Sequence, residues 1–428
     1  MQKMDRPITH DSSPPATVYL VGAGPGDPGL ITAKGLDLLR RADAVVYDAL
    51  ANPALLEEAR RDAELIDAGK RAKKHKLTQD ETNALLVELA TAGKTVVRLK
   101  GGDPYVFGRG SEEALHLHAH GVPFEVVPGI TAGIAGPGAA GVPVTHRNVA
   151  VTCTFITGHE DPTKDEAQTD YAALAALVRA GGTLCFYMGM GRLGRIVGEL
   201  VSRGVSANTP VAVVQWGTTP RQRSAQAPVH EIERAVDEAG LGPPAIVVVG
   251  DAAGLDREAL NWFERRPLFG QTIAVTRTRH QASELSRRLL ELGARVIEAP
   301  TIDIVPPDDW EPIRDAVRDL SSYDWLVLTS VNGVAGLKQV MDELELDARG
   351  LAGVKVAAIG DATAEAIQQQ LGVRPDLVPT KFVAESLAAE LIADHDIAGK
   401  RLLLMRADIA RPALVEKLAE AGAEVTDR

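Results

Sequence analysis

The stretch VYLVGAGPGDPGL, residues 18–30, places an apolar run directly before a turn with four glycines. The order of strand, glycine-rich turn and helix start is typical of α/β proteins that bind a nucleotide at a strand end. A pyrophosphate would need backbone N–H groups in the turn. Pro25 and Pro28 have none, and Asp27 would repel the phosphates. The stretch therefore predicts a nucleoside site and argues against a dinucleotide fingerprint.

Short β-rich runs alternate with helical periods along the whole chain, and this alternation predicts an α/β fold with mostly parallel strands. TVYLVG, ADAVVYD, KTVVRLKGG and FEVVPG are four such runs. We expect a disordered tail over residues 1–16 and two α/β subdomains over 17–130 and 131–258. A linker over 259–268 then leads to a further domain over 269–428.

The last domain carries an internal repeat. Residues 272–296 align with 401–425 at a constant offset, so that Arg277 matches Arg406 and Gly293 matches Gly422. Each copy predicts a strand, a helix, a Gly-Ala turn and a strand, which is the general pattern of a parallel βαβ unit. The first copy continues for over a hundred residues, whereas the second stops at Arg428. The chain therefore looks cut off inside this domain.

Composition restricts the class of protein. The 428 residues are 45% apolar and 24% charged, as in ordinary soluble proteins. The net charge of −12 argues against a nucleic-acid or membrane-surface protein, and no run approaches the roughly 18 apolar residues of a spanning helix. Cys153 and Cys185 lie in apolar runs, so we expect buried thiols and neither a disulfide nor a metal site. Together these features predict a cytoplasmic protein.

The densest candidate site is VVRLKGGDPYVFGRGSEE, residues 96–113. Gly101 and Gly102 would let a ligand approach the backbone, and Asp103 could accept hydrogen bonds from a ribose or an amine. Arg109 lies in a second glycine-flanked turn, from which it could reach an anion. The alternative is a tight turn with a capping Asp, but eighteen residues this rich in Gly, Arg and Asp favour a site.

Further candidates are basic side chains and one methionine. The basic run at residues 70–76 is either a solvated surface or a mobile lid for a polyanionic substrate. His146 and Arg147 follow a proline turn and are anion candidates. Met188 ends a strand before a glycine, where it would either fill the core or cover an adenine or a sulfonium group.

The ordered set VGAGPGDPGL, VVYD, GKR, RLKGGDPYVFGRG, VVPGITAG, GVPVTHR, TGH and FYMG makes residues 17 to about 255 resemble the uroporphyrinogen-III methyltransferases of the tetrapyrrole methylase family. The resemblance implies a homodimer of two-subdomain α/β chains with S-adenosyl-L-methionine in the cleft. It also implies that Asp48 is the proton acceptor and Lys70 the proton donor, and that Arg109, His146 and Arg147 face the substrate. The implied cofactor-binding residues are Pro25, Gly101, Gly102, Asp103, Val106, Thr131, Ala132, Met188 and Gly217.

The chemistry of that family agrees with these residue types. Uroporphyrinogen III carries eight carboxylates, which Lys, Arg and His suit. Methyl transfer is an in-line displacement at the sulfonium carbon, so the enzyme mainly aligns donor and acceptor. Asp48 would then remove the proton from the methylated pyrrole. Two transfers would give precorrin-2, and with no further module before residue 17 the chain is expected to stop there. Whether that product goes to sirohaem or to cobalamin stays open.

The last domain resembles the uroporphyrinogen-III synthase family through IAVTRTRHQASELSRRLLELGARVIEAP, LTSVNGV and VAAIGDATAEAI. That family closes hydroxymethylbilane into uroporphyrinogen III without a cofactor. The resemblance implies a partial two-lobed α/β domain with a cleft lined by Thr329, Ser330, Asn332, Gly360 and Thr363. It covers only part of the family's length, which leaves synthase activity open. The fusion supports both resemblances, because the synthase's product is the methylase's substrate.

Three alternatives remain. The opening turn could serve a nicotinamide-dependent oxidoreductase, although Pro25, Asp27 and Pro28 argue against it. A methylase of the same fold could act on another substrate, such as a later corrinoid or diphthine. The C-terminal part could be a binding module without catalytic activity.

Overall fold

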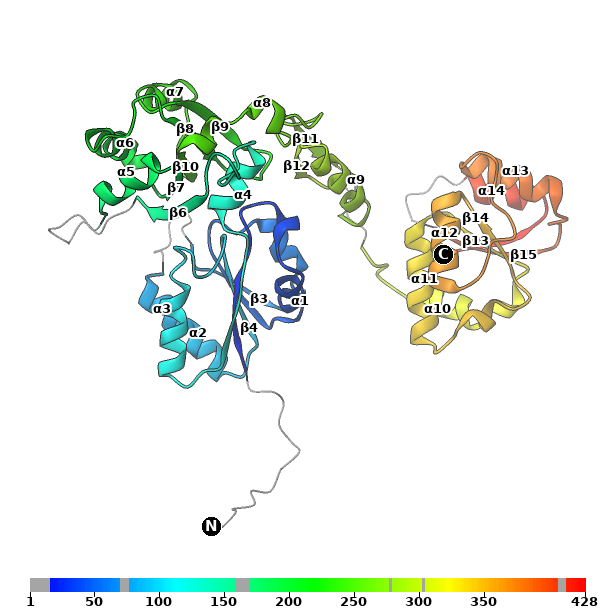
Figure 1. Ribbon diagram of the computed structural model, residues 1–428. Coiled ribbons are helices and arrows are strands. Elements are labelled where there is room, and N and C mark those ends of the chain that lie inside the picture. Colours follow the sequence, from blue (N-terminus) through cyan, green and yellow to red (C-terminus); the bar gives the residue numbers. More distant parts are fainter. Residues whose placement is uncertain (1–15, 70–76, 159–168, 277–278, 302–304, 407–412) are drawn as a thin grey trace, which may run out of the picture. The chain divides into compact units, whose positions relative to one another are not determined.

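The structure is a computed structural model that describes residues 16–69, 77–158, 169–276, 279–301, 305–406 and 413–428 (Figure 1). The basic run at 70–76 and Arg277 therefore lie outside the described residues. So does the predicted tail, except for Ala16. The chain forms two compact units, Met1–Asp303 and Ile304–Arg428. Among the described residues, no helix is long and apolar enough to cross a membrane.

The first sheet is entirely parallel, with the strand order β3-β2-β4-β1-β5. Its strands are β1 (Val18–Gly22), β2 (Ala44–Tyr47), β3 (Glu64–Asp67), β4 (Val96–Lys100) and β5 (Phe124–Val127). One face packs against α2 (Gln79–Thr91) and α3 (Gly110–Ala119), and the other against α1 (Ala33–Arg41) (Figure 1). Because both faces are covered, β1 and β4 are buried along almost their whole length; β1 is a nearly continuous apolar run, whereas β4 also carries the buried Arg98 and Lys100.

The second sheet, β6-β7-β10-β8-β9, is mixed. Its strands are β6 (Thr152–Thr157), β7 (Gly182–Tyr187), β8 (Pro210–Gln215), β9 (Arg223–Pro228) and β10 (Ala245–Val249). The helices are α4 (Ala132–Ala139), α5 (Tyr171–Arg179), α6 (Leu193–Ser202) and α7 (Ile232–Glu238). Only β6 and β7 pair in parallel, whereas β10 runs antiparallel to both its neighbours. The predicted parallel pairing is therefore confirmed for the first sheet, but in the second sheet it holds only for β6 and β7. The short turn 216–222 joins β8 to β9, and a connection this short can join only antiparallel strands.

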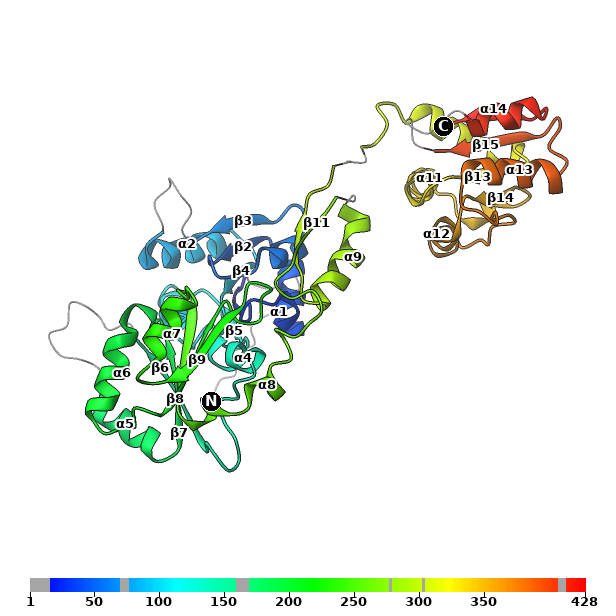
Figure 2. The ribbon, with the colours of Figure 1, turned by 90° about the horizontal axis from the view of Figure 1, so that it is seen from above.

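The first unit ends with a short helix and a βαβ unit. These elements are α8 (Arg257–Leu260), β11 (Thr272–Val275), α9 (Arg279–Glu291) and β12 (Arg295–Glu298); Figure 2 shows α9 alongside β11. Upstream, Cys153 on β6 and Cys185 on β7 are free thiols with their Sγ atoms 3.7 Å apart.

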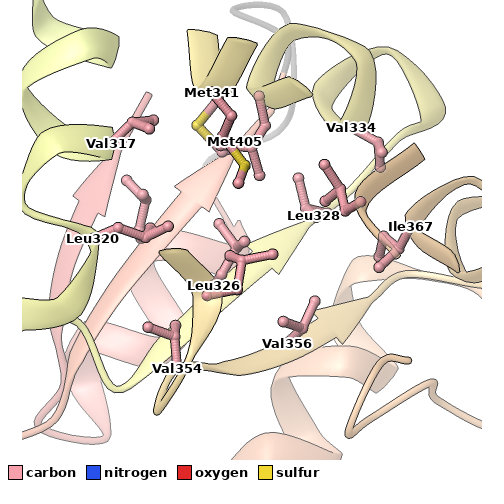
Figure 3. Close-up of a cluster of buried hydrophobic side chains, with 14 of the residues drawn as sticks. Val317, Leu320, Leu326, Leu328, Val334, Met341, Val354, Val356, Ile367 and Met405 are labelled. Atoms are coloured by element: carbon pink, nitrogen blue, oxygen red, sulfur yellow. The ribbon is translucent and has the colours of Figure 1, made fainter. Parts of the chain in front are cut away.

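The second unit is a parallel sheet, β14-β13-β15-β16, with helices on both faces. Its strands are β13 (Trp325–Leu328), β14 (Lys355–Ala358), β15 (Arg401–Met405) and β16 (Glu424–Asp427). Its helices are α10 (Glu311–Arg318), α11 (Val331–Glu343), α12 (Asp361–Leu371), α13 (Ala384–Asp394) and α14 (Ala413–Glu420). Figure 3 shows the core on one face, where Leu326 and Leu328 of β13 meet Met341 of α11.

The predicted internal repeat is confirmed. β11 pairs in parallel with β12, with Thr272 opposite Arg295, and β15 pairs in parallel with β16, with Arg401 opposite Glu424. The two registers correspond at the offset found in the sequence. Gly293 and Gly422 both have positive φ, +93° and +86°, where each helix turns into its second strand. The Gly-Ala turn is therefore a backbone requirement that both copies share.

The core in Figure 3 gives a first prediction. Leu326→Ala should lower the free energy of unfolding of the second unit by about 2–5 kcal/mol, because Leu326 is fully buried and its loss leaves a cavity. Hydrogen exchange of peptides from β13 and β15 measures this. Val305→Ala is the matched control, since Val305 is 73% exposed. Equal exchange in the two variants would contradict the packing described here.

Candidate active site

The first unit contains a cavity of about 1100 Å³ at the strand ends of its two sheets. Eight of the nine residues expected to bind the cofactor line this cavity: Pro25, Gly101, Gly102, Val106, Thr131, Ala132, Met188 and Gly217. They come from segments spread over about two hundred residues of sequence. The fold therefore brings together, around one cavity, residues from separate sequence motifs that were each expected to bind the cofactor.

The floor of the cavity is formed by turns that touch through their backbones. A Cβ on Gly22 would lie 2.5 Å from Gly129 Cα and 2.7 Å from Gly102 O, so no side chain fits there. Gly24 and Gly102 exchange backbone hydrogen bonds, with N···O distances of 3.2 and 2.7 Å. These glycines thus let the turns after β1, β4 and β5 interlock, and the ligand meets peptide groups at this wall.

Asp103, which was expected to bind the cofactor, and Asp27, which was expected to repel phosphates, both hold these turns. Asp103 Oδ1 accepts hydrogen bonds from the backbone N–H groups of Tyr105 and Val106, and its Oδ2 accepts from Gly129 N. Asp103 is not among the residues that line the cavity. Asp27 Oδ1 caps a short helix by accepting from Gly29 N, and Asp27 N donates to Thr218 Oγ1 at 3.1 Å.

Tyr187 is a site residue that the sequence reasoning did not single out. Its hydroxyl accepts a hydrogen bond from Gly133 N at 2.7 Å and lies 2.6 Å from Thr131 Oγ1, at the first turn of α4. Burial raises the pKa of Tyr187, so the hydroxyl is neutral. Its ring packs on Phe107 with centroids 4.9 Å apart. The sequence feature that could have identified Tyr187 is its position directly before Met188, at the end of a buried strand.

Met188 itself has φ +54°, a left-handed conformation that a non-glycine residue rarely adopts. Its side chain is 55% exposed and lines the cavity, so it is not core filler. Such backbone strain is concentrated at ligand sites, where surrounding contacts hold it. The exposed thioether at this rim agrees with the interpretation that it covers a ligand.

Asp48 directly follows β2, is not among the cavity-lining residues and belongs to a buried charge network. Arg98 Nη2 donates to Asp48 Oδ1, and Arg98 Nε donates to Glu113 Oε1 at 3.0 Å. Lys100 Nζ donates to the same Glu113 oxygen at 2.8 Å. The Asp48 side chain is 33% exposed, whereas the other three are almost fully buried. The neighbouring residues Ala49 and Leu50 line the cavity.

The network fixes the charges below Asp48. Burial alone would lower the pKa of Arg98, but the charges of Asp48 and Glu113 outweigh it and raise that pKa. Burial, together with the charge of Arg98, lowers the pKa of Lys100. Arg98 therefore stays charged and orients the Asp48 carboxylate, while Asp48 Oδ2 has no hydrogen-bond partner among the described residues.

The residues predicted to face the substrate do not line the cavity. Arg109, with φ +58°, forms a bidentate pair with Glu112 at the start of α3. His146 and Arg147 are exposed in a turn closed by hydrogen bonds between His146 and Ala150. Lys70 lies outside the described residues. Their substrate roles stay predictions.

The synthase-like candidates lie at the carboxyl ends of two neighbouring parallel strands of the second unit. Thr329, Ser330 and Asn332 follow β13, and Gly360 and Thr363 follow β14. Ser330 caps α11 by accepting a hydrogen bond from Gly333 N at 3.0 Å. Thr363 is buried and Asn332 is exposed. The sheet thus brings these residues to one edge.

Comparison with known proteins agrees with this architecture. Residues 17–233 match the family model of the tetrapyrrole (corrin/porphyrin) methylases, and residues 283–428 match that of uroporphyrinogen-III synthase. The porphyrin biosynthesis protein HemD of Ruminiclostridium josui is 39% identical over 94% of this chain and 78% of its own. The uroporphyrinogen-III C-methyltransferase of Bacillus subtilis is 40% identical over 89% of this chain and 77% of its own.

A solved structure supports the fold of the first unit. Cobalt precorrin-4 methyltransferase is 30% identical, with a TM-score of 0.50, over 55% of this chain and 95% of its own. The chain therefore belongs to the tetrapyrrole methylase family, and a uroporphyrinogen-III synthase domain follows the methylase. It is a methyltransferase of tetrapyrrole biosynthesis. The family's methyl donor is S-adenosylmethionine, which confirms the expected cofactor.

Tyr187 gives the second prediction. Tyr187→Phe should destabilise the first turn of α4 by about 1–3 kcal/mol, because Gly133 N and Thr131 Oγ1 lose their buried partner. Faster hydrogen exchange of peptides that cover α4 would report this loss. Tyr105→Phe is the control, since Tyr105 is exposed. Unchanged exchange in Tyr187→Phe would contradict the capping role.

Proposed function

We propose that this chain transfers two methyl groups from S-adenosyl-L-methionine to uroporphyrinogen III and so forms precorrin-2. The observation that carries the proposal is the meeting of eight expected cofactor residues in one cavity. Pro25 and Pro28 at its edge remove N–H groups that a pyrophosphate would need, which suits a nucleoside without phosphates. This argues against the nicotinamide alternative.

The cavity also suits a second, polyanionic ligand. Its volume of about 1100 Å³ is slightly above the roughly 300–1,000 Å³ typical of single-ligand pockets. Arg221, Arg266 and Arg295 are among its lining residues, and none of them forms an ion pair with a described acidic residue. Burial and the nearby charge of Arg295 lower the pKa of Arg221. Guanidinium groups bind carboxylates well.

Asp48 serves in the proposal as the base that removes the proton from the methylated pyrrole. Arg98 supports this role because it holds Asp48 Oδ1 and leaves Oδ2 available. Lys70 stays the predicted proton donor. We further propose that the chain works as a homodimer in the cytoplasm. Exposed apolar side chains in the first unit, such as Ile134 and Val151, are consistent with such a contact.

A direct assay tests the proposal. The chain is incubated with S-adenosylmethionine and either uroporphyrinogen III or hydroxymethylbilane, and products are identified by mass. Dimethylated product from uroporphyrinogen III is the expected result. The same product from hydroxymethylbilane would add synthase activity, whereas methylation from uroporphyrinogen III alone would assign only the methylase. No methylation from either substrate would refute the proposal.

Asp48→Asn isolates the base. The amide keeps an oxygen that can accept from Arg98, but it cannot take up a proton, so turnover should fall about 10²- to 10⁴-fold. Binding of S-adenosylhomocysteine, measured by calorimetry, should be unchanged. Asp37→Asn, in an exposed pair with Arg41, is the control. Turnover at the wild-type rate in Asp48→Asn would remove Asp48 from the mechanism.

A further inference from the structure

The turn 216–222, between β8 and β9, carries Gly217 and five further cavity-lining residues in a strained backbone. Trp216 has φ +50° and Thr218 has φ +68°, although neither is a glycine. Gly217 packs so closely on α4 that a Cβ on it would lie 2.5 Å from Gly136 Cα. A conformation of this kind persists only where surrounding contacts determine it. The contacts that hold this turn are therefore part of the cavity's construction.

Gln222 provides one of these contacts from inside the turn. Its Oε1 accepts a hydrogen bond from Thr218 N at 2.8 Å, which fixes the strained residue. Its Nε2 donates to Glu264 Oε1 at 3.0 Å. Gln222 is only 2% exposed, so water cannot easily replace either partner. The geometry of the turn is thus connected directly to Glu264, which lies 42 residues further along the chain.

Glu264 lies on the segment that follows β10 and is held at both carboxylate oxygens. Ser224 Oγ donates to Oε1 at 2.6 Å, while Arg257 Nη2 and Asn261 Nδ2 each donate to Oε2 at 2.7 Å. Its side chain is 18% exposed. A carboxylate that accepts hydrogen bonds from four donors in such a site is held in one position, unlike a mobile surface group.

Arg257 extends the same network to α4, which begins with the cavity residue Ala132. Arg257 Nε donates to Ala140 O at 3.0 Å, at the C-terminal end of that helix, and Nη2 also donates to Ser224 Oγ. The segment 257–264 therefore contacts both walls that meet at Gly136 and Gly217. The match to the methylase family model ends at residue 233, before this segment begins.

We propose that Glu264 is a positioning residue for the cofactor cavity: through Gln222 it holds the turn 216–222 in its cofactor-binding shape. The proposal rests on the proposed function, because it takes the ligand at Gly217 to be S-adenosylmethionine. Glu264 touches no ligand, and its effect reaches the cavity through Thr218 N and the contact of Gly217 with α4.

Two variants and a control test the proposal in the full chain. Glu264→Ala removes all four contacts, whereas Glu264→Gln keeps an oxygen for Gln222 and Ser224 but places an amide nitrogen that accepts from neither Arg257 nor Asn261. Glu258→Ala is the control. It removes an acid of the same segment whose side chain is 89% exposed and whose ion pair with Arg265 is long, at 3.5 Å. The readouts are hydrogen exchange of peptides covering 216–222 and the Kd of S-adenosylhomocysteine by calorimetry.

We expect Glu264→Ala to speed exchange of 216–222 in the ligand-free protein and to raise the Kd about tenfold, or about 1.4 kcal/mol. The KM for S-adenosylmethionine should rise in parallel with little change in kcat, and Glu264→Gln should recover most of the loss. Glu258→Ala should match wild type. Unchanged exchange and Kd in Glu264→Ala, or a loss that Glu258→Ala reproduces, would overturn the proposal.

The two proposals fail in different ways. If the wild-type chain does not bind S-adenosylhomocysteine, the proposed function fails, while exchange of 216–222 still reports on the role of Glu264. If wild type binds but Glu264→Ala melts at a lower temperature with an unchanged Kd, Glu264 is merely structural and the positioning role is wrong.

Discussion

The cavity depends on one steric constraint, the approach of Gly22, Gly102 and Gly129 at the carboxyl ends of three neighbouring parallel strands. A Cβ on Gly22 or on Gly129 would overlap backbone atoms of the other turns, so these turns can interlock only without side chains. Parallel sheets bind ligands at this edge because their loops gather there. The interlocking also makes this wall of the cavity a surface of peptide groups.

The second subdomain reaches the cavity by the same kind of contact. Gly136 of α4 and Gly217 of the turn 216–222 touch through their backbones, and Tyr187 holds the first turn of α4 at its other end. Asp27 N donates to Thr218 Oγ1 and so joins the glycine-rich turn of the first subdomain to this second wall. Both walls are therefore built from backbone contacts held by a few buried polar side chains.

The parts of this design that local sequence encodes could be predicted. Strand ends, the glycine turns and the βαβ repeat with its Gly293 and Gly422 follow from patterns a few residues long. The antiparallel β10 and the roles of Tyr187 and Glu264 depend on partners that are distant in the sequence, and no local pattern reports such pairs. Asp103 shows the limit most clearly. Its position beside the ligand was predicted, but its carboxylate is used by the three N–H groups of its own turns.

The turn that first suggested a dinucleotide also limits the charge of the ligand. Asp27 Oδ1 accepts from Gly29 N and the Asp27 backbone N–H donates to Thr218 Oγ1, so this acidic residue is held at the edge of the cavity. That fixed charge, with two prolines that lack N–H groups, disfavours phosphates and is compatible with a cation. A sulfonium is such a cation, and the guanidinium groups of Arg221, Arg266 and Arg295 among the lining residues suit the anionic acceptor of the proposed function. The cavity thus offers charge of both signs, an acid from the glycine-rich turn and guanidinium groups from other lining segments, which suits a cationic methyl donor and the anionic acceptor of the proposed function.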